Sequence, residues 1–174
     1  AAAVAIDARH APYLRMRAEE RHRTPSALDT LLRARFGARG PHTPLTRGLW
    51  SSAYEQLGKA YVQVAQPARA VPALLQAVAL TPERAAARSN LGVAFEQAGD
   101  LARALEHTSR AVELEPGRPT PWVNLTRLVL RLQGPAAASG VLHEAARRGA
   151  TDPRLAALAR ELGAGAVAQG TTRR

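Results

Sequence analysis

Side-chain amides recur at a fixed interval along this sequence and could bind the main chain of another polypeptide. Gln56, Asn90 and Asn124 follow one another in equal steps of 34 residues. Each amide carries both hydrogen-bond donors and an acceptor, as a peptide bond also does. A column of such amides can therefore hold an extended peptide without reading its side chains.

Two further rows of mostly polar residues follow the amides, one and two helical turns later. Spacings of three and seven residues place each row on the same helical face as its amide. The cations among them, Lys59, Arg127 and Arg131, favour an acidic ligand. The same residues could also form an ordinary solvated surface, and both interpretations stay open at this level. The candidate peptide-binding residues are Gln56, Lys59, Gln63, Asn90, Gln97, Asn124, Arg127 and Arg131.

No group of residues in the sequence predicts catalysis, a metal site or a cofactor site. Cysteine is absent, which excludes disulfides, zinc-thiolate sites and thiol nucleophiles. His143-Glu144 resembles the start of a zinc-protease motif, but Arg147 stands where the second histidine is required. We therefore expect a binding protein that is not an enzyme and that needs no metal or cofactor.

The candidate residues belong to an internal repeat, because small, apolar and proline positions return with the same period. A Leu-Gly-x-x-aromatic motif at 57–61 returns at 91–95, and a Trp-x-x-Leu motif follows at 122–125. The coincident small residues and prolines include Ala70 and Ala104, Ala77 and Ala111, Pro82 and Pro116, and the later Ala138 and Ala145. The predicted repeats are 51–84, 85–118 and 119–152.

Each repeat contains two helix-periodic stretches that a helix breaker separates. The breakers are Gln66-Pro67, Gly99-Asp100 and Gly134-Pro135. Thr81-Pro82 and Thr120-Pro121 each place an N-cap residue before a proline, which predicts that helices start there. One such unit cannot bury its apolar face alone, so stacked repeats would share a continuous core.

This pattern resembles the tetratricopeptide repeat family, whose 34-residue repeat has Trp, Leu-Gly, Tyr, Ala and Pro at the same places. The sequence departs from that pattern at Arg88, Thr108, Thr126 and Val129. The resemblance implies an all-α, right-handed superhelix of about three helix-turn-helix repeats with a capping helix. In this family the first helix of each repeat lines a concave groove, so the candidate residues would face a protein or peptide ligand there.

Two known groups within the family suggest different ligands. The amide column is similar to the asparagine ladder of the sugar-transferase superhelices. Chaperone-binding members use charged groups to grip a C-terminal carboxylate, and Asn90 matches one position of that clamp. However, Glu55 and Thr120 stand where the clamp has basic groups. The resemblance therefore favours a groove that binds a peptide main chain.

The predicted repeat domain, 49–162, follows an N-terminal segment, 1–48. Within that segment we expect a helix over 24–37 and a more charged helix over about 11–22, before a Gly- and Pro-containing connector. The segment is either a degenerate repeat or the end of a further domain.

The C-terminal end of the repeats predicts a capping helix at 153–162, which starts at Asp152-Pro153. One face of this helix would cover the last core layer and the other would meet water, as the end of a solenoid requires. The leucines on the covering face are Leu155, Leu158 and Leu162. Residues 163–174 are predicted to be a disordered tail.

The charge of the chain does not by itself predict a nucleic-acid site. The net charge is +10, but no block of five or six like charges occurs. The expected function is therefore a protein-interaction scaffold, with self-association through exposed helix faces as a further expectation. One alternative is a C-terminal appendage of a larger enzyme, such as a membrane glycosyltransferase, that positions substrate or mediates assembly. Another is electrostatic binding to nucleic acid or an anionic surface.

The compartment stays open in the sequence. No apolar run reaches the roughly 18 residues that cross a bilayer. The chain starts with three alanines and no methionine, which fits a mature form after signal cleavage or a piece of a longer protein. A cytoplasmic location and an exported part of a larger bacterial protein are both consistent with this start.

Overall fold

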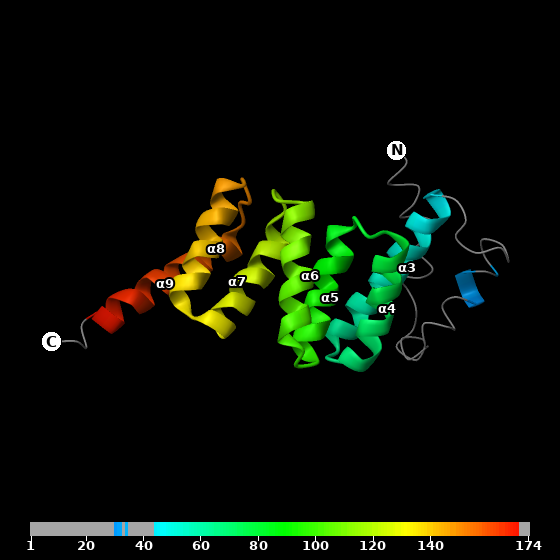
Figure 1. The fold of residues 1–174 in the computed structure, drawn as a ribbon, viewed down its shortest axis with the longest axis horizontal. Helices are drawn as coiled ribbons and strands as arrows, with labels where there is room; N and C mark the ends of the chain where they lie inside the picture. The colour runs from blue at the N-terminus through cyan, green and yellow to red at the C-terminus, as the bar shows by residue number, and fades with distance from the viewer. Residues whose placement is uncertain (1–29, 33, 35–43, 171–174) are drawn as a thin grey trace.

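The computed structural model describes residues 30–32, 34 and 44–170, with side chains described as far as residue 163. The helices of this part follow one another in a row, and no β-strand occurs among the described residues (Figure 1). The predicted all-α solenoid is therefore confirmed. The helices are α3 (Pro44–Gln63), α4 (Pro67–Leu80), α5 (Ala85–Gln97), α6 (Leu101–Leu114), α7 (Pro119–Gln133), α8 (Pro135–Arg147) and α9 (Pro153–Gly170).

Consecutive helices form hairpins, in which α3 packs on α4, α5 on α6, and α7 on α8. Each predicted helix breaker lies at the turn of one hairpin, so the breakers are confirmed. Positions 65 and 99 are equivalent in the first two turns, and both have a positive φ, 52° at Ala65 and 83° at Gly99. Glycine adopts this conformation without cost, whereas alanine is strained by it.

Glycine allows the two helices of a hairpin to approach each other closely. A Cβ atom at Gly58 would lie 2.3 Å from Cγ of Leu74. A Cβ atom at Gly92 would lie 2.2 Å from Oγ1 of Thr108, and 3.1 Å from the main-chain oxygen of Ala104. The third hairpin has Thr126 at this position, fully buried, and its hydroxyl donates to the Trp122 carbonyl at 2.8 Å.

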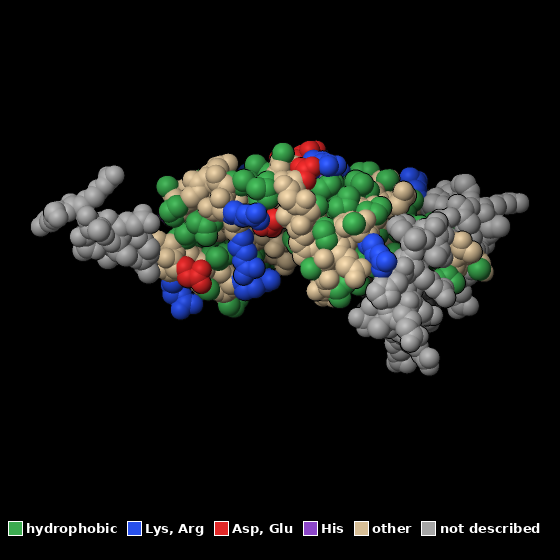
Figure 2. All heavy atoms as spheres, turned by 90° about the horizontal axis from the view of Figure 1, so that it is seen from below, with side chains coloured by type: hydrophobic (Ala, Val, Ile, Leu, Met, Phe, Trp, Pro, Cys, Tyr) green, Lys and Arg blue, Asp and Glu red, His purple; other side chains and the backbone are tan. Residues whose placement is uncertain are grey.

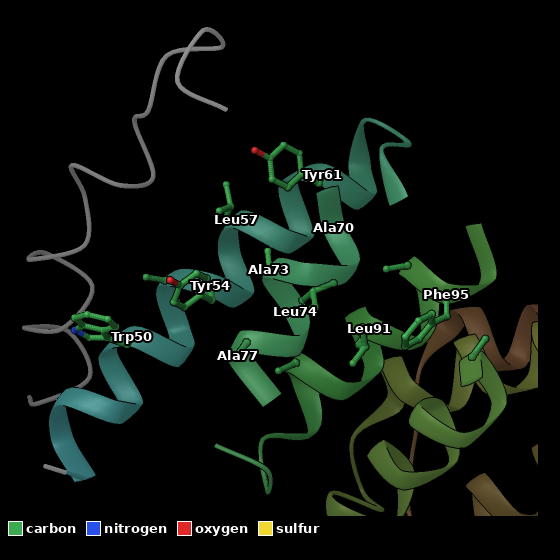
Figure 3. Close-up of a cluster of buried hydrophobic side chains, with 14 of the residues drawn as sticks. Trp50, Tyr54, Leu57, Tyr61, Ala70, Ala73, Leu74, Ala77, Leu91 and Phe95 are labelled. Carbon is green, nitrogen blue, oxygen red and sulfur yellow. The ribbon is translucent and has the colours of Figure 1, made fainter. Parts of the chain in front are cut away.

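Buried apolar side chains form two clusters along the solenoid. The first lies mainly between α3, α4 and α5 and includes Tyr61 and Leu74 (Figure 3). The second lies mainly between α7, α8 and α9 and includes Trp122. Helix α7 contributes to both clusters, because Leu128 belongs to the first. Leu105 of α6 packs against both clusters, so α6 and α7 together form the boundary between them.

The helix starts predicted at Thr81-Pro82 and Thr120-Pro121 are wrong. Helix α5 starts at Ala85, and Thr81 ends α4, where its hydroxyl contacts the hydroxyl of Ser51 on α3. Helix α7 starts at Pro119, so Thr120 already lies in its first turn. Both sequence pairs look like N-caps locally. At Thr81 the contact with Ser51 decides where the helix ends, and at Thr120 the earlier Pro119 decides where the helix starts.

Both flanks differ in extent from the prediction. Helix α3 starts at Pro44, inside the expected connector, where the missing N–H of proline costs nothing. Helix α9 continues to Gly170, so the predicted tail is helical over 163–170, where alternate alanines favour helix. Residues 30–32 and 34 are helical as predicted, and Leu32 is buried in the first cluster. The other predictions for the N-terminal segment, and for residues 171–174, lie outside the described residues.

We expect Gly92→Ala to lower the free energy of unfolding by about 1–3 kcal/mol. The added methyl group would meet main-chain atoms of α6, which cannot rotate away. Gly140→Ala is the matched control, because Gly140 lies inside α8 with open space around it. That change should raise the free energy of unfolding by about 0.5–1 kcal/mol. Urea denaturation measures both, and equal effects would show that the α5–α6 contact is not tight.

The imidazole of His107 is a half-buried titratable group in the second hairpin. It stacks on the ring of Phe95, with ring centroids 5.4 Å apart and ring planes 13° apart. Its Nδ1 atom is buried and has no hydrogen-bond partner among the described residues. Burial lowers the pKa of His107, the charge of Glu106 raises it, and the charges of Arg88 and Arg103 lower it further. The folded protein therefore favours the neutral imidazole.

This shift predicts a loss of stability in mild acid. Because the pKa of His107 is lower in the folded protein, protons bind the unfolded chain first as the pH falls. The contribution is complete above the unfolded pKa, about 6.5, and is lost as the pH falls from there through the lower folded pKa. We expect the free energy of unfolding of His107→Gln to fall less over this range. His143→Gln, at an exposed position, is the control, and parallel pH profiles of wild type and His107→Gln would contradict the prediction.

Candidate peptide-binding groove

The first helices of the hairpins form the closely packed side of the solenoid. Helix α3 contacts α5, α5 contacts α7, and α7 contacts α9. No extensive contact joins α4 to α6 or α6 to α8 in the described part of the chain. A stack that is closer on one side curves toward that side, so α3, α5 and α7 line its concave surface. We call this surface the groove.

A pocket of about 180 Å³ opens in the groove where α3, α5 and the start of α7 meet. Sites for small molecules usually measure roughly 300–1,000 Å³, so this pocket suits a single side chain or chain end. Its walls present a carboxylate, two cations, an amide and two hydroxyl groups. The residues that carry them are Glu55, Lys59, Ser89, Asn90, Arg118 and Thr120.

The structure brings only two of the predicted binding residues into this pocket, Lys59 and Asn90. Lys59 is exposed on α3, and Asn90 is half-buried on α5. Gln56 and Gln63 of α3 and Arg127 of α7 are exposed on the helices beside it. Of the predicted column of amides, Asn90 lines the pocket, and the role of the column in binding remains a prediction.

Two other predicted binding residues, Gln97 and Asn124, join consecutive hairpins. The amide of Gln97 donates to the main-chain oxygen of Val62 at 3.0 Å, which links α5 to α3. The amide of Asn124 donates to the hydroxyl of Ser89 at 3.0 Å, which links α7 to α5. These side chains stabilise the stacking of the repeats, in addition to any contact with a ligand.

Arg131, the last of the predicted residues, also reaches the neighbouring hairpin. Its guanidinium lies 3.5 Å from the carboxylate of Glu96 on α5. The Arg131 side chain is nevertheless 58% exposed, so this ion pair is open to water. Exposed pairs of this kind contribute little to stability, and the cation stays accessible to a ligand.

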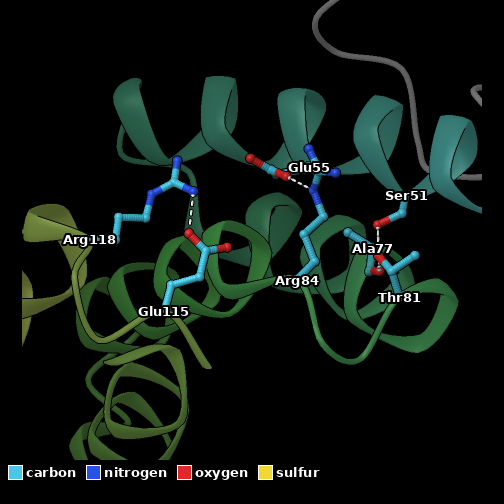
Figure 4. A network of polar contacts seen from close by, with 7 residues as sticks. All are labelled: Ser51, Glu55, Ala77, Thr81, Arg84, Glu115 and Arg118. Carbon is cyan, nitrogen blue, oxygen red and sulfur yellow. Dashed lines mark hydrogen bonds and ion pairs between the residues drawn. The ribbon is translucent and has the colours of Figure 1, made fainter. Parts of the chain in front are cut away.

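A buried carboxylate forms one wall of the pocket. The side chain of Glu55 on α3 is only 7% exposed and forms an ion pair with Arg84, which precedes α5 (Figure 4). A buried carboxylate is costly unless it is paired, and Arg84 supplies that partner for Glu55. Glu55 therefore places a fixed negative charge beside Lys59 and Asn90.

Arg118 occupies the repeat position of Arg84, one period later and directly before α7. Ser89 stands one period after Glu55, so the contact of α5 with α7 has a hydroxyl where the contact of α3 with α5 has a carboxylate. Arg118 instead pairs with Glu115 in its own turn at 2.8 Å, and its side chain is 47% exposed. Figure 4 shows both guanidinium groups on the side that faces α3.

Sequence reasoning missed two charged positions that lie between helices, beside the candidate site. Arg84 and Arg118 were not candidates, although they are related by the same period as the amides. The signal was present, because an arginine returns directly before the first helix of two repeats. It would have been found by applying the period to the turns as well as to the helices.

The described residues contain no cluster of His, Cys, Asp or Glu that could hold a metal ion. None of the described helices is long and apolar enough to cross a membrane. On the face shown in Figure 2, the largest group of Lys and Arg side chains lies over the part of the solenoid that contains α7.

Two family models match the chain, and both describe a tetratricopeptide repeat. They cover residues 55–119 and 95–162, which together make up more than half of the sequence. The chain belongs to the tetratricopeptide repeat family. No curated protein sequence matches it.

Solved structures with the same fold are also tetratricopeptide repeat (TPR) domains. The Sgt2 TPR domain from Aspergillus fumigatus has a TM-score of 0.61 at 16% identity, over 70% of this chain and 82% of that one. The TPR2B domain of yeast Sti1, in a complex with pHsp70, has a TM-score of 0.60 at 18% identity, over 67% and 98%. The first TPR of Spaghetti (RPAP3), bound to the HSP90 peptide SRMEEVD, has a TM-score of 0.60 at 12% identity, over 69% and 95%. These similarities show a shared fold.

We expect Asn124→Ala to lower the free energy of unfolding by about 1 kcal/mol, because the change removes the hydrogen bond between α7 and α5. Gln56→Ala should leave stability unchanged, since Gln56 is exposed at the equivalent position of the first repeat. Urea denaturation of the two variants measures the difference. If both variants were as stable as wild type, Asn124 would have no structural role.

Proposed function

We propose that this protein is a scaffold that binds an extended polypeptide segment in the groove over α3, α5 and α7. The pocket with Lys59 and Asn90 is the observation that carries the proposal. Its volume suits one residue of a peptide, and its amide can both donate to and accept from a peptide main chain. The exposed Gln56 and Arg127 extend the polar surface along the neighbouring helices.

The charges of the groove favour a segment with acidic residues. No ion pair joins Lys59 or Arg127 to an acidic group of the described residues. The pair between Arg131 and Glu96 is long and exposed to water. Cations in this state attract an acidic ligand and orient it as it approaches.

The solved relatives support this reading of the groove. The RPAP3 domain was solved with an acidic peptide, SRMEEVD, and the Sti1 domain with pHsp70. A helical solenoid of this size can therefore bind a short segment of another protein. The ligand of this chain follows from its own groove residues, because the identities to those domains are only 12% and 18%.

Selection from a phage-displayed library of random heptapeptides tests the proposal. The bait is the full chain, and the groove variant is Lys59→Gln combined with Asn90→Ala. We expect peptides enriched on wild type to bind the groove variant at least about tenfold more weakly, because two polar contacts are lost. Fluorescence anisotropy of synthetic copies of the enriched peptides measures this ratio.

Arg110→Gln is the control for a general effect of charge, because Arg110 lies on α6, away from the groove, and pairs with Glu113. It should bind the enriched peptides as wild type does. If no peptide were enriched, or if the groove variant bound the enriched peptides with unchanged affinity, the proposed function would be wrong.

A further inference from the structure

The groove has two junctions between repeats, α3 with α5 and α5 with α7, and an arginine precedes the second helix of each at the same repeat position. At the first junction Arg84 meets Glu55, which reaches it from α3. At the second junction Arg118 meets no equivalent carboxylate, since Ser89 holds the position of Glu55. Glu55 and Arg118 both line the pocket, so a group that enters it meets both a carboxylate and a guanidinium.

The charges of the pocket and of its ion-pair partners nearly cancel. The cations are Lys59, Arg84 and Arg118, and the carboxylates are Glu55 and Glu115. One positive charge is left, and Lys59 is the cation without an acidic partner among the described residues. One carboxylate of a ligand is therefore enough to neutralise the pocket, with hydrogen bonds from the Asn90 amide and the Thr120 hydroxyl.

We infer that Glu55 limits this pocket to a ligand group with a single carboxylate and disfavours a group that carries two. The inference rests on the proposed function and specifies its ligand. Glu55 is 7% exposed, so dissolved salt screens its charge far less than it screens a surface charge. Among the residues that line the pocket, a second carboxylate would find no further unpaired cation, and it would lie near this negative charge.

The carboxylate could come from an acidic side chain or from the C-terminus of a peptide. Both kinds of carboxylate would form the same ion pair with Lys59, and they differ only in the atoms attached to the carboxylate. A set of probes of nearly equal size separates them. N-acetylglutamine amide has no carboxylate, N-acetylglutamate amide has one on the side chain, N-acetylglutamine has one at the terminus, and N-acetylglutamate has both.

Titration of each probe into the full ¹⁵N-labelled chain, followed by the side-chain amide signal of Asn90, measures the four dissociation constants. For wild type we expect both one-carboxylate probes to bind more tightly than the uncharged probe. N-acetylglutamate should bind no more tightly than the better of them. The ratio of the dissociation constants of the two one-carboxylate probes then identifies the source that the pocket prefers.

Two variants test the role of Glu55. In Glu55→Gln the pocket gains one net positive charge, and we expect N-acetylglutamate to bind on the order of tenfold more tightly than to wild type. The double variant Glu55→Gln with Arg84→Gln removes both members of the pair and restores the original net charge. Its preference among the probes should return toward that of wild type. Overlay of the ¹H–¹⁵N spectra confirms that both variants keep the fold.

The inference is wrong if wild type already binds N-acetylglutamate about tenfold more tightly than either one-carboxylate probe. It is also wrong if Glu55→Gln leaves that affinity unchanged, or if no probe shifts the Asn90 signal. Heptapeptides enriched in the groove selection, together with charge-independent probe binding, would overturn this inference and keep the proposed function. If the probes showed the single-carboxylate limit but no peptide were enriched, the proposed function would be overturned and the limit of the pocket would stand.

Discussion

The distance between the two helices of each hairpin is the constraint on which the rest of the structure depends. At Gly58 and Gly92 the helices are so close that a single added carbon would overlap the partner helix. Close pairing leaves room for the large residues, such as Tyr61 and Leu91, to fill the spaces between hairpins. It also fixes how each first helix lies against the next, and hence the curvature of the groove and the place of its pocket.

The same constraint explains which parts of the fold could be predicted from sequence. Close approach tolerates few residue types, so Gly58 and Gly92 recur visibly, and the repeat with its three breakers could be found. The end of a helix can also depend on a contact between distant residues, which leaves no local pattern. Thr81 looks like an N-cap, but the hydroxyl of Ser51 from another helix holds it at the end of α4.

The helices that carry the candidate site were predictable from the sequence, but the contacts of its side chains were not. Period and helical spacing correctly placed Lys59 and Asn90 on the first helices, where they meet in one pocket. They could not show that the Asn124 amide binds Ser89, because this depends on the distance and side-chain rotamers between two repeats. Arg84 escaped notice because it lies in a turn, and only the stacking of α3 on α5 brings it to Glu55.

The division of the core into two clusters has a consequence for cooperativity. Contacts in a solenoid run only between neighbours, so the helices on each side of the α6–α7 boundary can open as separate units. The groove crosses this boundary, since α3 and α5 belong mainly to one cluster and α7 mainly to the other. A peptide bound across these helices would tie the two units together. Hydrogen exchange in the free protein would then show two levels of protection, which ligand binding would merge into one.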